Sequence, residues 1–413
     1  MKKNERQWLQ ASTVLFILNV AASALNYLCQ LVMGRFFSVE SYGTINTIFS
    51  FMMIVAVPGT TLTMIVAKYY ASATDESGKY GYLKKQLRIV LFLTIGVFLL
   101  LLSVQKVLAD VLSIQDNFVL FLAFVLAALG YFQPFYSGVF SGNKHFVLVG
   151  MYSLFIPLYK LAAVGVAYIY SLNDTKRLYM VLIFMVAGVF VTALFGQIKT
   201  NGILGKSKKK ENFRGCLYTL EDMNALILNI SLMLYMNVDL LAVRYYGDEL
   251  ESGLYSSVLL FGRIIYYFAT TLGTILLPSV ANNSLSDRKR NIILNRTLYV
   301  MLLFAVVCMI PINIWKDLFI KILFGENYLP ASKYVIYVSI ISLSLSIYTI
   351  LINYVVGIGK TKMAAMVMLI VDLLLGVTIC IFHNINTILL SIGGIGIGGA
   401  LVIYGLNHMQ KRE

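Results

Sequence analysis

Long apolar runs alternate with short polar segments along the whole chain of 413 residues. A helix needs about 20 residues to cross the ~30 Å hydrocarbon core of a bilayer, because each residue adds ~1.5 Å to its length. Twelve runs reach that length, so the pattern predicts twelve membrane-spanning helices. Their predicted positions are residues 9–33, 45–70, 87–108, 117–140, 147–170, 178–198, 217–243, 253–280, 292–314, 332–358, 361–382 and 384–406.

The composition agrees with this pattern. Hydrophobic residues make up 59% of the chain and charged residues 13%, whereas soluble domains carry roughly 25% charged residues. We therefore expect an all-α, polytopic membrane protein. Most basic residues fall in alternate connections, as expected for cytoplasmic loops, which places both termini in the cytoplasm. This bias explains the net charge of +14 and the basic run Lys206–Lys210 without a nucleic-acid partner, since such a loop binds anionic lipid headgroups.

One short pattern occurs twice. GRFFSVESYG, Gly34–Gly43, follows the first predicted span, and VRYYGDELESGLY, Val243–Tyr255, follows the seventh with the same order of arginine, aromatic pair, acidic residue and glycine. A fainter pair, SGNKHF at 141–146 and GIGKTK at 357–362, also separates equivalent spans. The spacing of six spans predicts a tandem duplication. Chance recurrence of interfacial aromatic residues is the alternative.

The duplication predicts two six-helix lobes, residues 1–205 and 206–413. Because six is even, both lobes have the same orientation in the membrane, and their pseudo-two-fold axis lies along the membrane normal. Two such lobes enclose a central cleft, and rocking one lobe against the other exposes the cleft to each side in turn. The pattern therefore predicts a transporter.

The two repeated stretches carry a family resemblance. NVDLLAVRYYGDELESGLYSSVLLFGR, Asn237–Arg263, with the proline-terminated span ending at Pro278, resembles the seventh-to-eighth helix region of bacterial polysaccharide and lipid-linked oligosaccharide flippases. RFFSVESYGTINTI, Arg35–Ile48, resembles their first-to-second helix region. These flippases belong to the multidrug, oligosaccharidyl-lipid and polysaccharide exporter superfamily.

The resemblance implies a multi-pass protein of the bacterial cytoplasmic membrane that serves polysaccharide biosynthesis for the cell envelope. Its implied activity moves an undecaprenyl-diphosphate-linked oligosaccharide from the inner to the outer leaflet by alternating access. Membrane lipid, the lipid-linked oligosaccharide, a polysaccharide polymerase and glycosyltransferases are the implied partners.

Basic side chains inside the spans form the predicted substrate-binding set. An ionisable group deep in a span costs roughly 2.5–3.5 kcal/mol on insertion scales, so each one calls for a functional hypothesis. Lys160 in the fifth span and Arg263 in the eighth would place positive charge in the cleft, which suits a diphosphate. Arg35 and Lys68 would extend this positive charge toward the two openings of the cleft. The alternative is that these long basic side chains, which lie near helix ends, extend to the membrane interface and bind no substrate.

Two acidic residues are candidates for ion coupling. Asp239 lies near the outer end of the seventh span and Asp372 lies in the eleventh. A buried carboxylate can change its charge when the cleft changes its access to water, which would couple transport to protons or sodium ions. An ion pair with Arg263 or Lys160 is the alternative, and the sequence leaves both open.

Three prolines mark predicted hinges. Pro58, Pro134 and Pro157 fall inside the second, fourth and fifth spans, where proline removes a hydrogen bond and kinks the helix. All three belong to the first lobe, which is therefore predicted to bend more than the second. Static kinks are the alternative.

Other motifs give no support for an enzyme. YVVGIGKT, Tyr354–Thr361, lacks the first glycine of a phosphate loop, and Gly394, Gly396 and Gly399 fit close helix packing better than a dinucleotide loop. The four cysteines and three histidines lack metal-ligand spacing, so we expect no metal and no cofactor. Two alternatives to the flippase are a cation-coupled multidrug exporter of the same superfamily and, from another class, a membrane-embedded glycan polymerase or transferase.

Overall fold

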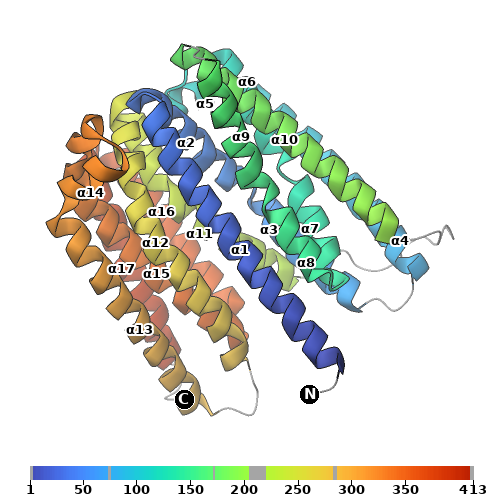
Figure 1. The fold of residues 1–413 in the computed structure, drawn as a ribbon. Coiled ribbons are helices and arrows are strands. Elements are labelled where there is room, and N and C mark those ends of the chain that lie inside the picture. Colours follow the sequence, from blue (N-terminus) through green and yellow to red (C-terminus); the bar gives the residue numbers. More distant parts are fainter. Residues whose placement is uncertain (1–2, 73–75, 171–172, 204–219, 282–285, 410–413) are drawn as a thin grey trace. The chain divides into compact units, whose positions relative to one another are not determined.

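The computed structural model describes residues 3–72, 76–170, 173–203, 220–281 and 286–409, and all its regular elements are helices (Figure 1). The described residues divide into two compact units. The first unit comprises those within 1–41 and 51–222, and the second unit those within 42–50 and 223–413. The predicted lobe boundary at residue 205 lies outside the described residues.

The helices follow the predicted spans closely. Before residue 204 they are α1 (Lys3–Phe36), α2 (Val39–Val55), α3 (Val57–Ser72), α4 (Glu76–Ser103), α5 (Gln105–Leu112), α6 (Asn117–Leu129), α7 (Phe132–Gly142), α8 (Phe146–Ser153), α9 (Phe155–Ile169) and α10 (Asp174–Ile203). From residue 220 they are α11 (Leu220–Tyr246), α12 (Glu249–Val280), α13 (Asp287–Ile314), α14 (Lys316–Leu323), the 3-10 helix η1 (Glu326–Tyr334), α15 (Val335–Gly357), α16 (Thr361–Ile381) and α17 (Ile385–Met409).

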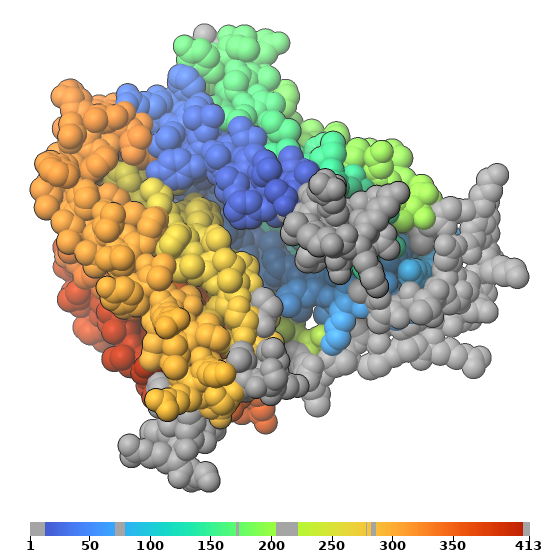
Figure 2. All heavy atoms as spheres, turned by 60° about the horizontal axis from the view of Figure 1, so that its bottom comes forward, coloured from blue at the N-terminus to red at the C-terminus, as the bar shows by residue number. Residues whose placement is uncertain are grey.

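The spans predicted from the sequence are confirmed. Eleven helical segments of the described chain are long and apolar enough to cross a membrane, and the bent pair α2–α3 makes a twelfth. The surface agrees: α13, gold to orange in Figure 2, exposes Tyr299, Leu303 and Val307, the kind of side chains that lipid tails solvate. The chain is a multi-pass membrane protein.

Two short helices add to the predicted spans. α5 follows α4, which holds the third span, and α14 follows α13, which holds the ninth. Each exposes apolar side chains, Val107 on α5 and Ile322 on α14, as helices at a membrane surface do. Their spacing of six spans repeats the spacing of the two sequence motifs.

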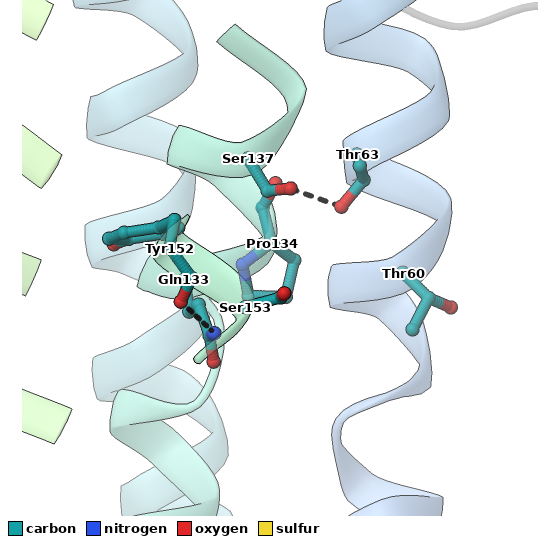
Figure 3. A pocket seen from close by; sticks show the side chains of 7 residues that line it. All are labelled: Thr60, Thr63, Gln133, Pro134, Ser137, Tyr152 and Ser153. Atoms are coloured by element: carbon teal, nitrogen blue, oxygen red, sulfur yellow. Dashed lines mark hydrogen bonds between the residues drawn. The ribbon is translucent and has the colours of Figure 1, made fainter. Parts of the chain in front are cut away.

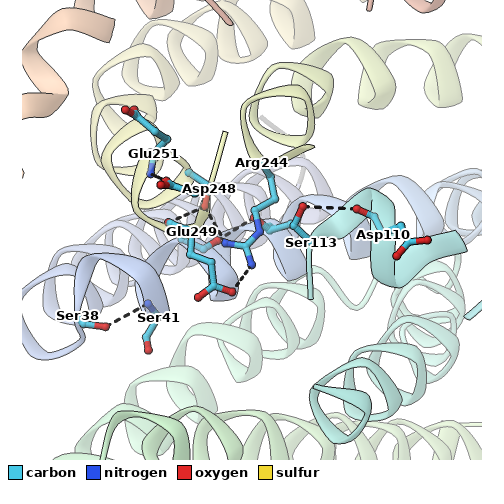
Figure 4. Close-up of polar contacts among 11 residues, drawn as sticks. Ser38, Ser41, Asp110, Ser113, Arg244, Asp248, Glu249 and Glu251 are labelled. Atoms are coloured by element: carbon cyan, nitrogen blue, oxygen red, sulfur yellow. Dashed lines mark hydrogen bonds and ion pairs between the residues drawn. The ribbon is translucent and has the colours of Figure 1, made fainter. Parts of the chain in front are cut away.

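The repeated motif encodes the end of one helix and the start of the next. α1 ends at Phe36, and after two residues the Ser38 hydroxyl caps α2 by accepting from the Ser41 amide at 3.2 Å (Figure 4). α11 ends at Tyr246, and after two residues Asp248 caps α12 by accepting from the Glu251 amide at 2.7 Å. A cap that bonds the third helical residue satisfies an amide that the helix leaves without a partner. The two copies therefore build the same local structure.

The first half of α2 packs within the second unit. Gly43 lies against the start of α12, where a Cβ atom on it would be 2.5 Å from the Gly253 amide nitrogen and 2.6 Å from the Ser252 hydroxyl. The Tyr42 ring meets Phe324 and Tyr328 at centroid distances of 6.1 and 6.0 Å. Only a residue without a side chain fits at position 43.

We expect Gly43→Ala to lower the free energy of unfolding by about 1–3 kcal/mol, because the added methyl group meets backbone atoms that cannot rotate away. Thermal unfolding of the detergent-purified protein measures this. Gly96→Ala in α4 is the matched control, since a Cβ atom there would have nothing within 4 Å. Equal unfolding midpoints for the two variants would contradict the close packing of α2 on α12.

Candidate functional site

A buried acid and a basic side chain of the second unit lie within electrostatic reach of each other. Asp239 on α11 is 2% exposed, and Arg263 on α12 is partly buried. The Tyr255 hydroxyl donates to Oδ2 of Asp239 at 2.8 Å, and the Leu240 amide donates to Oδ1 at 2.7 Å. These bonds orient the carboxylate without using Arg263.

Arg263 is near enough to attract the Asp239 carboxylate electrostatically. It nevertheless forms no ion pair or hydrogen bond with any residue that the structure describes. A guanidinium carries five N–H donors in a planar fork that matches phosphate or carboxylate oxygens. Within the described chain, the donors of Arg263 are thus available to a ligand.

Asp372 on α16 belongs to a second polar cluster of this unit. Its Oδ1 atom, the Ser231 hydroxyl and the Tyr348 hydroxyl are all buried without a hydrogen-bond partner among the described residues. The Ser231 hydroxyl on α11 is near enough to hydrogen-bond with the carboxylate, and Tyr348 on α15 lies within its electrostatic reach. A buried polar group without a partner costs about 1–3 kcal/mol. Three such oxygens close together suit a water molecule or a small cation.

α17 approaches these side chains through its glycines. A Cβ atom on Gly399 would lie 1.8 Å from the Tyr348 hydroxyl, and one on Gly396 would lie 1.8 Å from the Tyr235 hydroxyl. The Tyr235 hydroxyl is hydrogen-bonded to Ser344. Gly396 and Gly399 therefore serve close helix packing, as their pattern predicted, whereas a Cβ atom on Gly394 would have nothing within 4 Å.

The other predicted basic residues have different surroundings. Lys160 on α9 is partly buried in the first unit, within electrostatic reach of Cys29 on α1. Lys68 near the end of α3 and Arg35 in the last turn of α1 are both exposed. Lys160 and Arg263 belong to different units, so their joint action on one ligand stays a prediction.

Arg244 has a structural role that was not predicted from the sequence. It occupies the place of Arg35 in the second copy of the motif, yet its side chain is fully buried. Its guanidinium pairs with Glu249 at 2.8 Å and donates to the Ser252 hydroxyl at 3.1 Å (Figure 4). The signal was present, because Glu249 and Ser252 lie in the first turn after the capping residue and so point back toward the end of α11.

The helices of the first unit break beside the predicted hinge prolines. α2 and α3 meet at Ala56 with a bend of 43°, two residues before Pro58. α6 gives way to α7 just before Pro134, and α8 to α9 just before Pro157. The Tyr131 hydroxyl, beside the break between α6 and α7, donates to the Val55 carbonyl at 2.6 Å. This carbonyl ends α2, so the bond gives a hydrogen-bond partner to a group at the break between α2 and α3. The kinks lie where the prolines predicted them, and their motion stays a prediction.

A cavity of 350 Å³ lies next to these breaks (Figure 3). Its lining comes from three helices of the first unit and includes Pro134. The polar lining residues are Thr60 and Thr63 from α3, Gln133 and Ser137 from α7, and Tyr152 and Ser153 from α8. By contrast, α12 and α15 of the second unit run without a break over 32 and 23 residues.

Several solved structures share this fold. An inward-facing multidrug resistance MATE family transporter of the MOP superfamily superposes with a TM-score of 0.71 at 12% identity, over 94% of each chain. The lipid II flippase MurJ, in an inward closed conformation, gives 0.70 at 16% identity over 95% of this chain and 86% of that one. A MOP superfamily transporter from Pyrococcus furiosus gives 0.62 at 12% identity over 98% and 95%.

No family model matches the sequence, and no curated protein matches it. The fold likeness nevertheless extends over almost the whole chain, at identities where sequence comparison fails. It confirms the fold that the span count and the repeated motifs predicted: the chain has the two-lobed, twelve-helix fold of the MOP superfamily transporters.

Proposed function

We propose that the protein is a flippase that moves an undecaprenyl-diphosphate-linked oligosaccharide from the inner to the outer leaflet by alternating access. Its fold, shared with a lipid II flippase and with multidrug transporters, supports membrane transport. The charge bias of the loops supports a bacterial cytoplasmic membrane protein with both termini inside.

The observation that most supports this proposal is the position of the Arg263 guanidinium. It sits in a spanning helix, where a charge costs roughly 2.5–3.5 kcal/mol, and has no ion pair among the described residues. A diphosphate would supply the missing partner through bidentate hydrogen bonds. Asp239 balances the charge while no substrate is bound. Lys160, Arg35 and Lys68 would add positive charge along the path of the headgroup.

Reconstitution tests the proposal. Purified protein is placed in liposomes with an undecaprenyl-diphosphate-linked oligosaccharide whose glycan carries a fluorophore, and a membrane-impermeant reductant quenches the outer leaflet. We expect quenching to approach completion with the protein and to stop at the outer-leaflet share in protein-free vesicles. Equal quenching in both would reject the flippase.

The buried carboxylates favour one alternative, a cation-coupled multidrug exporter. The buried oxygens around Asp372 suit a small cation, and structures of the same fold include multidrug resistance transporters. Uptake of a cationic dye into the same liposomes separates the two functions. Dye transport without lipid flipping would select the exporter.

Ion coupling yields a prediction for Asp372. We expect Asp372→Asn to abolish the dependence of transport on a sodium or proton gradient, because an amide cannot change its charge. The measurement is the ratio of initial rates with and without the gradient, which should fall to one. Asp317→Asn on the exposed face of α14 is the control and should keep the wild-type ratio. A wild-type ratio in Asp372→Asn would contradict the coupling role.

A further inference from the structure

We propose that the cavity of the first unit, lined by α3, α7 and α8, is a binding site for one neutral sugar residue of the cargo. This inference rests on the proposed function and adds a recognition site for the uncharged part of the substrate. The cavity is built from α3, α7 and α8 of a single unit, so its shape depends on that unit alone (Figure 3).

The lining has the chemistry of a sugar site. Most of its surface is apolar, its polar groups are hydroxyls and one carboxamide, and no charged side chain lines it; ligand pockets are commonly apolar with a few polar groups that fix orientation. A diphosphate would require Arg or Lys and a cationic drug would require a carboxylate. A sugar hydroxyl both donates and accepts, as do the groups that line this cavity.

Two lining groups have unused hydrogen-bonding capacity. The Ser137 hydroxyl forms no hydrogen bond with the described residues, and neither does the side-chain carbonyl of Gln133. The Gln133 amide nitrogen reaches only the Tyr152 carbonyl, at 3.4 Å. Both residues lie on α7, four positions apart, so their side chains share one helix face. They are the groups that a ligand would contact first.

The remaining walls are fixed. The Thr63 hydroxyl donates to the Pro134 carbonyl at 2.8 Å, and a Cβ atom on Gly59 would lie 3.1 Å from the Pro134 ring, which holds α3 against α7. The Tyr152 hydroxyl donates to the Thr192 carbonyl at 2.9 Å while its ring packs on Phe140. A site whose walls are already held loses little entropy when a ligand binds.

The prolines explain why the helices break beside the cavity. Pro134 and Pro157 lack the amide that would donate to the carbonyl four residues earlier, so α7 and α9 begin at breaks instead of continuing α6 and α8. The volume of 350 Å³ is at the lower end of the ~300–1,000 Å³ typical of ligand pockets. It suits a single ring and is too small for a whole lipid-linked oligosaccharide.

Binding of free sugars tests the site directly. The purified full-length protein is titrated with glucose, galactose and N-acetylglucosamine at millimolar concentrations, with choline as a cationic probe, and the unfolding midpoint is recorded. We expect at least one of the sugars, and not choline, to raise the midpoint by binding the native state. Gln133→Leu/Ser137→Ala should weaken that sugar's binding about ten-fold, because two hydrogen bonds are lost.

The controls separate binding from general effects of sugars on stability. Thr378→Val on α16 removes a hydroxyl of the second unit that does not line the cavity and should leave the sugar response unchanged. Ser137→Ala alone breaks no hydrogen bond of the described structure, so it serves if the double variant does not fold. Midpoint shifts equal in wild type and in the α7 variants would overturn the site, as would a response to choline alone.

Transport assays keep the two proposals distinct. If the α7 variants lose sugar binding but flip the labelled lipid-linked oligosaccharide at the wild-type rate, the cavity plays no part in recognition and this inference fails while the flippase stands. If wild-type protein binds sugar but flips no lipid, the flippase fails while the sugar site stands. Joint loss of sugar binding and flipping in the α7 variants supports both.

Discussion

Replacing Arg263 with alanine should reduce flipping of the lipid-linked oligosaccharide at least about ten-fold, the loss expected when a bidentate, charge-assisted contact worth ~1.5–3 kcal/mol disappears. Arg263 is partly buried in α12, and its donors have no partner among the described residues. A lipid-facing position would give nothing in return for the cost of inserting this charge. A ligand that binds the guanidinium would offset the cost of inserting it.

Two further variants separate the possible roles of Arg263. Arg263→Lys keeps the charge but loses the fork geometry, so it should be impaired less than Arg263→Ala. If Arg263 only neutralises Asp239, the double variant Arg263→Ala/Asp239→Asn should regain flipping, because no buried charge is left without compensation. We expect no such recovery. Arg296→Ala, on the exposed face of α13, is the matched control, and rates are normalised to the amount of reconstituted protein.

Arg244→Ala should destabilise the protein more than any other arginine substitution named here, by about 2–5 kcal/mol. The side chain is 0% exposed, so its removal leaves a cavity and deprives both Glu249 and Ser252 of a donor. Arg244→Lys should fall in between, because a single ammonium cannot hold both partners in the same geometry. The unfolding midpoint in detergent and the protein level in membranes measure the loss.

The chain contains its own control for this prediction. Arg35 has the same place in the first copy of the motif but is exposed. Arg35→Ala should therefore change the free energy of unfolding by no more than about 0.5 kcal/mol. If Arg35→Ala and Arg244→Ala unfold at the same midpoint, burial does not explain the role of Arg244.

The spans could be predicted because each depends only on its own residues. Length and hydropathy decide whether a segment crosses the bilayer, and all twelve predicted runs coincide with helical segments. The breaks near Pro58, Pro134 and Pro157 were equally local, since proline acts on its own helix. The repeated motif was visible for the same reason, because it stays within a short stretch of chain.

The sites depend on contacts between distant segments, and the sequence could not supply these. The cavity requires α3, α7 and α8 to meet, and no local pattern states that Thr60 lies near Ser137. The cluster at Asp372 likewise joins three helices. The capping pattern from Asp248 to Glu251 was readable, but the same cap at Ser38 follows the exposed Arg35, so the cap alone does not indicate that Arg244 turns inward.

Helix α2 cannot complete its packing until a later part of the chain has been synthesised. Its residues 42–50 pack into the second unit, and four of them carry buried polar side chains: Thr44, Asn46, Thr47 and Ser50. Gly43 needs the start of α12 as its neighbour, yet the ribosome makes α12 about 200 residues later, roughly 10–40 s at typical elongation rates. Throughout that delay this polar face must be covered by lipid or by the insertion machinery. A chain that stopped after α10 would never cover it.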